Sequence, residues 1–128
     1  MSLRLKFLGT GGAFTDFRVN YHNNAIVEIS PGRWVLIDCG GTAVQSLKEL
    51  GIRPWQIEAV LITHLHGDHV GGIEQLAWER LYTGEMGPGW RATNLVTPAP
   101  IGAGLHSILG PCVNEHAGCD GVIQGDGF

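Results

Sequence analysis

The sequence contains no long apolar run. No stretch approaches the roughly 20 consecutive apolar residues that a membrane-spanning helix needs, so we expect no association with a membrane. The first residues, from Leu3 to Lys6, alternate apolar and charged side chains, which is unlike a secretory signal peptide. Both observations favour a cytoplasmic location.

Basic residues are scarce. The chain has 8 lysines and arginines against 12 aspartates and glutamates, which gives a net charge of −4. The basic residues are also scattered, whereas proteins that bind nucleic acids concentrate them in a patch or along one stripe. This pattern argues against binding of RNA or DNA by this segment alone. It remains compatible with a small phosphorylated substrate held by metal ions.

Cysteine is also scarce, at three residues in 128. An odd count with no secretory leader favours free thiols in a reducing compartment, which again indicates the cytoplasm. Cys112 and Cys119, with His116 between them, could suggest a zinc knuckle. Their spacing fits none of the usual zinc-finger patterns, so this alternative is weak.

The apolar pattern that is present predicts one mixed α/β domain. Strands with alternating or continuous apolar residues are expected over 3–7, 25–29, 34–37, 59–62 and 94–97. Helical spacing is expected over 42–50, about 73–81 and 101–109. The first strand should be half-buried, and the second and third should pair as an antiparallel hairpin. The glycine-rich and proline-rich segment 83–90 should be a loop.

A glycine cluster, Gly9-Thr10-Gly11-Gly12, ends the first expected strand. It lacks the third spaced glycine of a dinucleotide-binding loop, and no amphipathic helix follows it. A tight loop that allows a close approach of backbone is the better interpretation.

Four ligand-type residues stand together in the segment Thr63-His64-Leu65-His66-Gly67-Asp68-His69, directly after the apolar run 59–62. On an extended backbone, His64 and His66 would point to the same side. Gly67 permits a sharp turn, from which Asp68 and His69 would project. Imidazole and carboxylate together suit Zn, Mn or Fe, and adjacent pairs suit two ions side by side. The sequence therefore predicts a metal site at this turn.

This motif resembles the His-x-His-x-Asp-His signature of the metallo-β-lactamase superfamily. The resemblance implies that His64 and His66 bind one metal and that Asp68 and His69 bind a second, with zinc the expected metal and Mn or Fe as alternatives. Asp68 would be the catalytic residue that holds a water molecule. By the same resemblance, Asp38 in Asp38-Cys39-Gly40 would brace the histidine loop through hydrogen bonds instead of binding metal. An aspartate that caps the following helix is compatible with that role.

The resemblance covers about residues 3–109 and implies a four-layer αβ/βα sandwich. The order of elements matches the amino-terminal half of that fold only. We therefore expect residues 1–128 to be a single metallo-β-lactamase-like domain truncated at its carboxyl end. Several strands are apolar on both faces, as doubly buried strands are. A cover is expected for the second face, from the missing second half of the same protein or from a second copy in a homodimer.

The segment Phe7-Leu8-Gly9-Thr10-Gly11-Gly12-Ala13-Phe14 resembles the opening of ribonuclease Z and its near relatives. This branch implies a metal-dependent hydrolase acting on a phosphodiester, either RNA or a small nucleotide. The expected function is a phosphodiesterase resembling ribonuclease Z, which processes transfer-RNA 3′ ends with a metal-activated water. One alternative is hydrolysis of cyclic nucleotides or other small phosphodiesters. Another is a fragment without catalytic activity until its missing half is supplied.

Three further histidines and two tryptophans lie outside these motifs. His22 and His106 are expected at the surface, and His116 matches no ligand motif. Trp78 falls off the apolar face of its expected helix, so it should pack on an element from outside the chain. Trp90, in the loop, is a candidate for contact with a substrate or partner.

Overall fold

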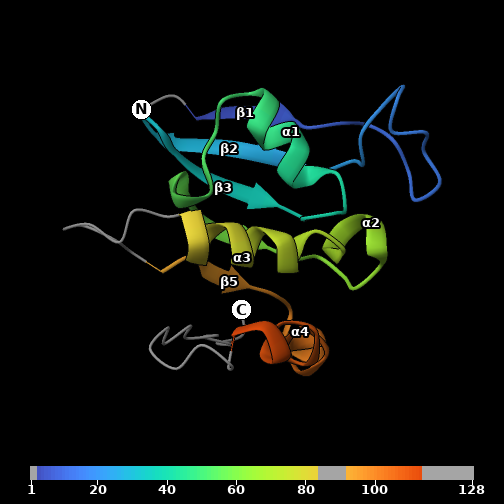
Figure 1. Cartoon of the computed structure of the whole chain (residues 1–128), viewed down its shortest axis with the longest axis vertical. Helices are drawn as coiled ribbons and strands as arrows, with labels where there is room; N and C mark the ends of the chain where they lie inside the picture. Colours follow the sequence, from blue (N-terminus) through green and yellow to red (C-terminus); the bar gives the residue numbers. More distant parts are fainter. Residues whose placement is uncertain (1–2, 84–91, 114–128) are drawn as a thin grey trace.

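A single mixed sheet organises the chain (Figure 1). The computed structural model describes residues 3–83 and 92–113. The strands lie side by side in chain order: β1 (Arg4–Phe7), β2 (Ala25–Ser30), β3 (Arg33–Ile37), β4 (Ile57–Leu61) and β5 (Asn94–Val96). The pairs β1–β2 and β2–β3 are antiparallel, and β3–β4 and β4–β5 are parallel. All five expected strands, the hairpin and the α/β class are confirmed.

The helices are α1 (Ala43–Glu49), the 3₁₀ turn η1 (Pro54–Gln56), α2 (Gly67–Val70), α3 (Ile73–Thr83) and α4 (Ala99–Val113). α1 and α3 lie in front of the same face of the sheet, and α4 lies beyond β5 (Figure 1). The three long helices were expected, whereas the single turn of α2 follows only from the structure. Among the described residues, no helix has the length and apolar character to cross a bilayer.

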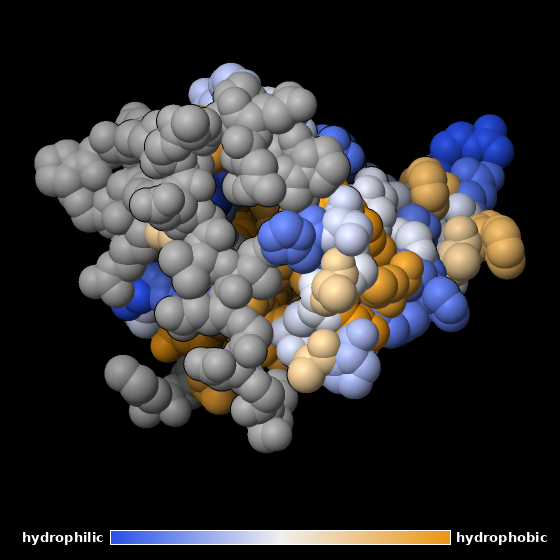
Figure 2. All heavy atoms as spheres, turned by 90° about the horizontal axis from the view of Figure 1, so that it is seen from below, coloured by the Kyte–Doolittle hydropathy of each residue, from blue (hydrophilic) through white to orange (hydrophobic). Residues whose placement is uncertain are grey.

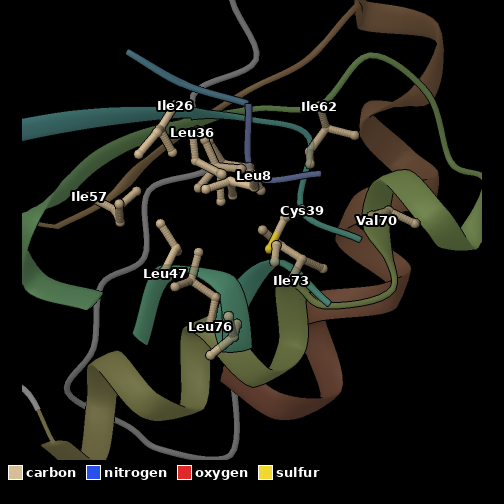
Figure 3. Packing of buried hydrophobic residues seen from close by; sticks show 14 of the residues in the cluster. Leu8, Ile26, Leu36, Cys39, Leu47, Ile57, Ile62, Val70, Ile73 and Leu76 are labelled. Atoms are coloured by element: carbon tan, nitrogen blue, oxygen red, sulfur yellow. The ribbon is translucent and has the colours of Figure 1, made fainter. Parts of the chain in front are cut away.

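The hydrophobic core fills the space between the sheet and these helices (Figure 3). Ile26, Leu36, Val60 and Leu95 stand opposite one another across four strands and are at most 9% exposed. Because side chains alternate along a strand, this row shares one face of the sheet. Leu47 of α1 packs against it. This face anchors the loops that follow β3 and β4.

The opposite face of the sheet is apolar too, and it is open at one edge. Its side chains form two rows across the strands: Leu5, Val27, Val35 and Ala59, then Phe7, Ala25, Ile37, Leu61 and Val96. All four residues of β1 are exposed, and Leu5 and Phe7 keep 59% of their surface. The expectation of a half-buried first strand is therefore wrong, because β1 is an edge strand and none of the described residues covers its apolar side. Apolar atoms also reach the surface on the side of α4 (Figure 2).

Two side chains of α3 differ from expectation. Trp78 packs against the core and stacks on Tyr82 of the same helix, with ring centroids 5.1 Å apart, so it needs no outside element. Arg80 falls between the apolar positions of the expected helix, yet it is 8% exposed and donates to the Pro54 carbonyl at 2.9 Å. Helical spacing identifies the apolar face of a helix. It does not show that the aliphatic part of an arginine side chain can be buried against a neighbouring element, here η1.

The two faces of the sheet predict different responses to the same truncation. Leu36→Ala removes a fully buried side chain between sheet and helices, and should lower the free energy of unfolding by about 2–5 kcal/mol. Leu5→Ala, at 59% exposure, is the matched control and should change it by about 0.5 kcal/mol or less. Urea denaturation followed by circular dichroism measures both. Equal losses would contradict this assignment of the two faces.

Candidate metal centre

The candidate site lies where two neighbouring parallel strands end. β3 and β4 run in the same direction, with Ile37 paired to Leu61. Parallel strands bring their carboxyl ends to one edge of a sheet, which is where ligands bind in open α/β sheets. The loop after β3 begins at Asp38, and the loop after β4 carries Thr63 to His69. Residues 25 positions apart are thereby placed in direct contact.

Asp38 connects these two loops through its carboxylate. Oδ1 accepts a hydrogen bond from the Thr63 backbone N–H at 2.8 Å, and the Thr63 hydroxyl lies 2.9 Å from Oδ2. Oδ2 is also 2.8 Å from Nδ1 of His69. Asp38 itself has a positive φ of 58°, a left-handed conformation that is uncommon outside glycine. Such conformations persist where surrounding contacts hold them, and they cluster at functional sites.

Three imidazole rings gather beside this carboxylate. The centroid of His64 lies 4.6 Å from that of His66 and 4.1 Å from that of His69. Nε2 of His69 is 3.3 Å from Oδ2 of Asp68. The four residues that the sequence marks as ligands are thus brought together. Their assignment as metal ligands, with Asp68 as the catalytic group and Asp38 as the brace, stays a prediction.

The chemistry of this donor set fits divalent metal, although the side chains are not aligned for it. Asp38 takes up Nδ1 of His69, which leaves Nε2 and the neighbouring Asp68 carboxylate as donors. Nε2 of His64 instead faces Nδ1 of His66 at 3.2 Å. Within residues 3–83 and 92–113, no group of three or more His, Cys, Asp or Glu side chains is arranged to hold one ion.

Direct contacts between backbones hold the two loops together. The Cys39 N–H donates to the His69 carbonyl at 2.7 Å, and the Gly72 N–H donates to the Cys39 carbonyl at 2.8 Å. A Cβ on Gly40 would fall against the Asp68 carbonyl oxygen, so only glycine permits this approach. Cys39 is fully buried, and its burial, followed by the negative charge of Asp38, raises the pKa of its thiol to about 12. Its burial and its raised pKa make it a packing residue and not a nucleophile.

The amino-terminal glycine loop packs against its own continuation. A Cβ on Gly9 would meet the Tyr21 backbone, and one on Gly11 would meet the Thr15 side chain. His22, expected at the surface, is 5% exposed and lies edge-on to Phe17, with centroids 4.9 Å apart. That expectation is wrong, because the close approach of the loop buries the ring against the Gly40 segment.

Other candidates from the sequence lie away from the centre or outside the described residues. His106 is exposed on α4, as expected. His116, Cys119 and Trp90 fall outside the residues that the structure describes, and the side chain of Cys112 does too. Sequence reasoning missed Asn24, which is 2% exposed and contacts both loops. The one feature of the sequence that could have pointed to Asn24 is its position, as a polar residue directly before an apolar strand.

The fold defines the chain as a metallo-β-lactamase-fold protein. It superposes on the metallo-β-lactamase fold protein YhfI from Bacillus subtilis with a TM-score of 0.69 and 17% identity, covering 98% of this chain and 46% of YhfI. Human tRNase Z, short form, gives a TM-score of 0.68 and 24% identity, covering 87% of this chain and 39% of that protein. Zn²⁺-bound PqqB from Methylobacterium extorquens gives 0.59 and 14%, covering 97% and 45%. At these identities the likeness establishes the fold alone.

Within that class, the chain belongs to the anti-Pycsar protein Apyc1 family, whose profile matches residues 3–115. It is 48% identical over 99 residues to Apyc1 from Paenibacillus sp. (strain J14), covering 77% of this chain and 39% of the relative. It is 41% identical over 122 residues to Apyc1 from Paenibacillus xerothermodurans, covering 94% and 46%. The chain therefore spans less than half the length of these curated relatives. The expected metallo-β-lactamase fold is confirmed, whereas the family shown is Apyc1 and not the ribonuclease Z branch that the opening segment suggested.

The cluster predicts where zinc binds. Crystals soaked in excess zinc should show anomalous signal within bonding distance of His64, His66, Asp68 or His69. His64→Ala should weaken zinc binding at least about tenfold, since it removes a donor. His106→Ala, which removes an exposed histidine on α4, is the control and should bind as the wild type does. Absence of signal at all four side chains would contradict the metal site.

Proposed function

We propose that this protein is a metal-dependent hydrolase that cleaves a phosphodiester bond. The observation that carries the proposal is the gathering of three imidazoles and the Asp68 carboxylate beside Asp38. Imidazole and carboxylate donors at this density suit zinc and its neighbours among divalent metals. The resemblance to the metallo-β-lactamase signature implies two ions, one at His64 and His66 and one at Asp68 and His69.

Each residue has a distinct part in this proposal. Bound metal would make a water molecule acidic enough to lose its proton near neutral pH and would polarise a phosphoryl oxygen. His64 and His66 supply neutral imidazole nitrogens. Asp38 holds the Nδ1 proton of His69 and so directs its Nε2 toward Asp68. The Asp68 carboxylate orients the attacking water and can accept its proton at Oδ2.

A cyclic nucleotide is the proposed substrate class. Membership of a family named for acting against Pycsar supports the small-phosphodiester alternative over transfer-RNA 3′ processing. The likeness to human tRNase Z, at 24% identity, supports a common fold and no common substrate. The net charge of −4 agrees with a small substrate, because gripping an RNA backbone calls for concentrated positive charge.

The whole protein needs a cover for the open face of the sheet. Leu5, Phe7 and Val27 lie on this face, and the curated relatives are more than twice as long as the matched part. We propose that a second half of the same protein packs there and completes the metal ligands, with pairing of two copies as the alternative. A sheet apolar on both faces is stable only when both are covered.

Activity can be tested with one substitution and one control. The protein carrying this chain should hydrolyse a 3′,5′-cyclic nucleotide and leave a transfer-RNA precursor uncut. Asp68→Ala should lower kcat/KM by at least about 100-fold with the fold intact. Asp16→Ala, which removes an exposed carboxylate paired only locally with Arg18, should leave the rate unchanged. Equal rates for Asp68→Ala and wild type would rule out its assigned part, and cleavage of the precursor alone would restore the transfer-RNA alternative.

The open face predicts how residues 1–128 behave alone. Because apolar surface at β1 is uncovered, the isolated chain should self-associate as its concentration rises. Light scattering across a dilution series measures this, and Phe7→Asp should reduce the association. A monodisperse monomer with a cooperative melt and two tightly held metals would contradict the need for a cover.

A further inference from the structure

Asn24 is a buried side chain whose two polar ends reach the two loops of the metal centre. Its Oδ1 accepts the Gly40 N–H at 3.0 Å, and its Nδ2 donates to the Asp68 carbonyl at 3.1 Å. The residue is 2% exposed and directly precedes β2. Its own backbone is fixed by Leu8 N–H and by the His22 carbonyl, each at 2.8 Å. The amide therefore acts from a rigid base.

The segment that Asn24 contacts cannot hold its own shape. α2 is a single turn of four residues, and a helix this short is not stable without outside contacts. Backbone N–H groups engage three carbonyls at this turn: His69 N–H donates to His66, Gly71 N–H to Gly67 and Cys39 N–H to His69. The carbonyl of Asp68 is held by the Asn24 side chain.

The peptide plane between Asp68 and His69 is thereby clamped on both edges. Its carbonyl oxygen accepts from Asn24, and its N–H donates to the His66 carbonyl at 2.9 Å. The Cα atoms of Asp68 and His69 lie at the two ends of this plane. Rotation of the plane would swing both side chains, whereas His64 and His66 precede it.

We propose that Asn24 is a positioning residue that sets the Asp68 and His69 side chains for the second metal ion and leaves the His64 and His66 pair largely unaffected. The proposal rests on the metal site put forward above. If Asn24 had a purely structural part, replacing it would lower the stability of the whole fold. It would then affect the His64 and His66 pair as much as the Asp68 and His69 pair.

Asn24→Asp is the sharpest test. The carboxylate has the same shape and can still accept the Gly40 N–H, but it has no donor for the Asp68 carbonyl. Asn20→Asp is the matched control, because Asn20 also bonds through both ends of its amide, here to Thr10 on the glycine loop. Both variants add one negative charge in the amino-terminal loop region.

Two measurements on the whole protein that carries this chain separate this proposal from the metal site itself. In cobalt(II) titrations followed by visible absorption, Asn24→Asp should weaken the second ion about tenfold to hundredfold and change the first by less than about threefold. With metal removed from both variants, the backbone amide of His69 should exchange with deuterium about tenfold faster in Asn24→Asp than in Asn20→Asp. Asn24→Ser, which buries no charge, should give the same pattern if Asn24→Asp does not fold.

Each outcome bears on the proposal. Equal weakening of both ions, or unchanged affinity with an unchanged His69 amide, overturns the part assigned to Asn24. Failure of the wild type to bind cobalt, with faster His69 exchange in Asn24→Asp, overturns the metal site but supports the clamp on this peptide.

Discussion

The carboxylate of Asp38 is the contact on which the candidate centre depends. Asp38 is 5% exposed, and its backbone has a strained, left-handed conformation. Its carboxylate contacts both Thr63 and His69. Strain of this kind costs about 1–3 kcal/mol, and hydrogen bonds to a charged group can offset it. Without Asp38, the loop after β4 would lose its tie to the loop after β3. The other features of the site, including the rings of three histidines, are arranged around this one connection.

In the two loops that Asp38 connects, glycines allow backbone segments to pack directly against each other. Gly40 lies against the Asp68 carbonyl, and Gly72 lies against the carbonyl of Gly40. These approaches leave the imidazoles as the groups that project from the loops. A site built in this way places its donors through the main chain, whose conformation is restricted, and depends less on long side chains that would lose rotamer freedom.

Much of this organisation could be predicted from the sequence. Apolar periodicity identified the five strands and three long helices, and the spacing of His64, His66, Asp68 and His69 identified the candidate ligands. Periodicity could not place Asn24 or His22, because their burial depends on a loop folding back onto a distant segment. It also misjudged β1, because alternation shows which side chains share a face but not whether anything covers that face. Contacts between distant loops were the information that pattern alone did not contain.

The order of strands in the sheet has a consequence for how the chain folds. Every strand pairs with its predecessor in sequence, from β1 to β5. Only the β2–β3 hairpin closes over a short turn, whereas the parallel pairs β3–β4 and β4–β5 close over longer segments that contain helices, so we expect the hairpin to form before the parallel pairs. Since proteins are synthesised from the amino terminus, β1 to β4 and the histidine loop emerge from the ribosome before β5 and α4 do. The Ile62 N–H, which donates to the Val96 carbonyl at 2.9 Å, therefore gains its partner only after the histidine loop has been synthesised, so the start of that loop is fixed late.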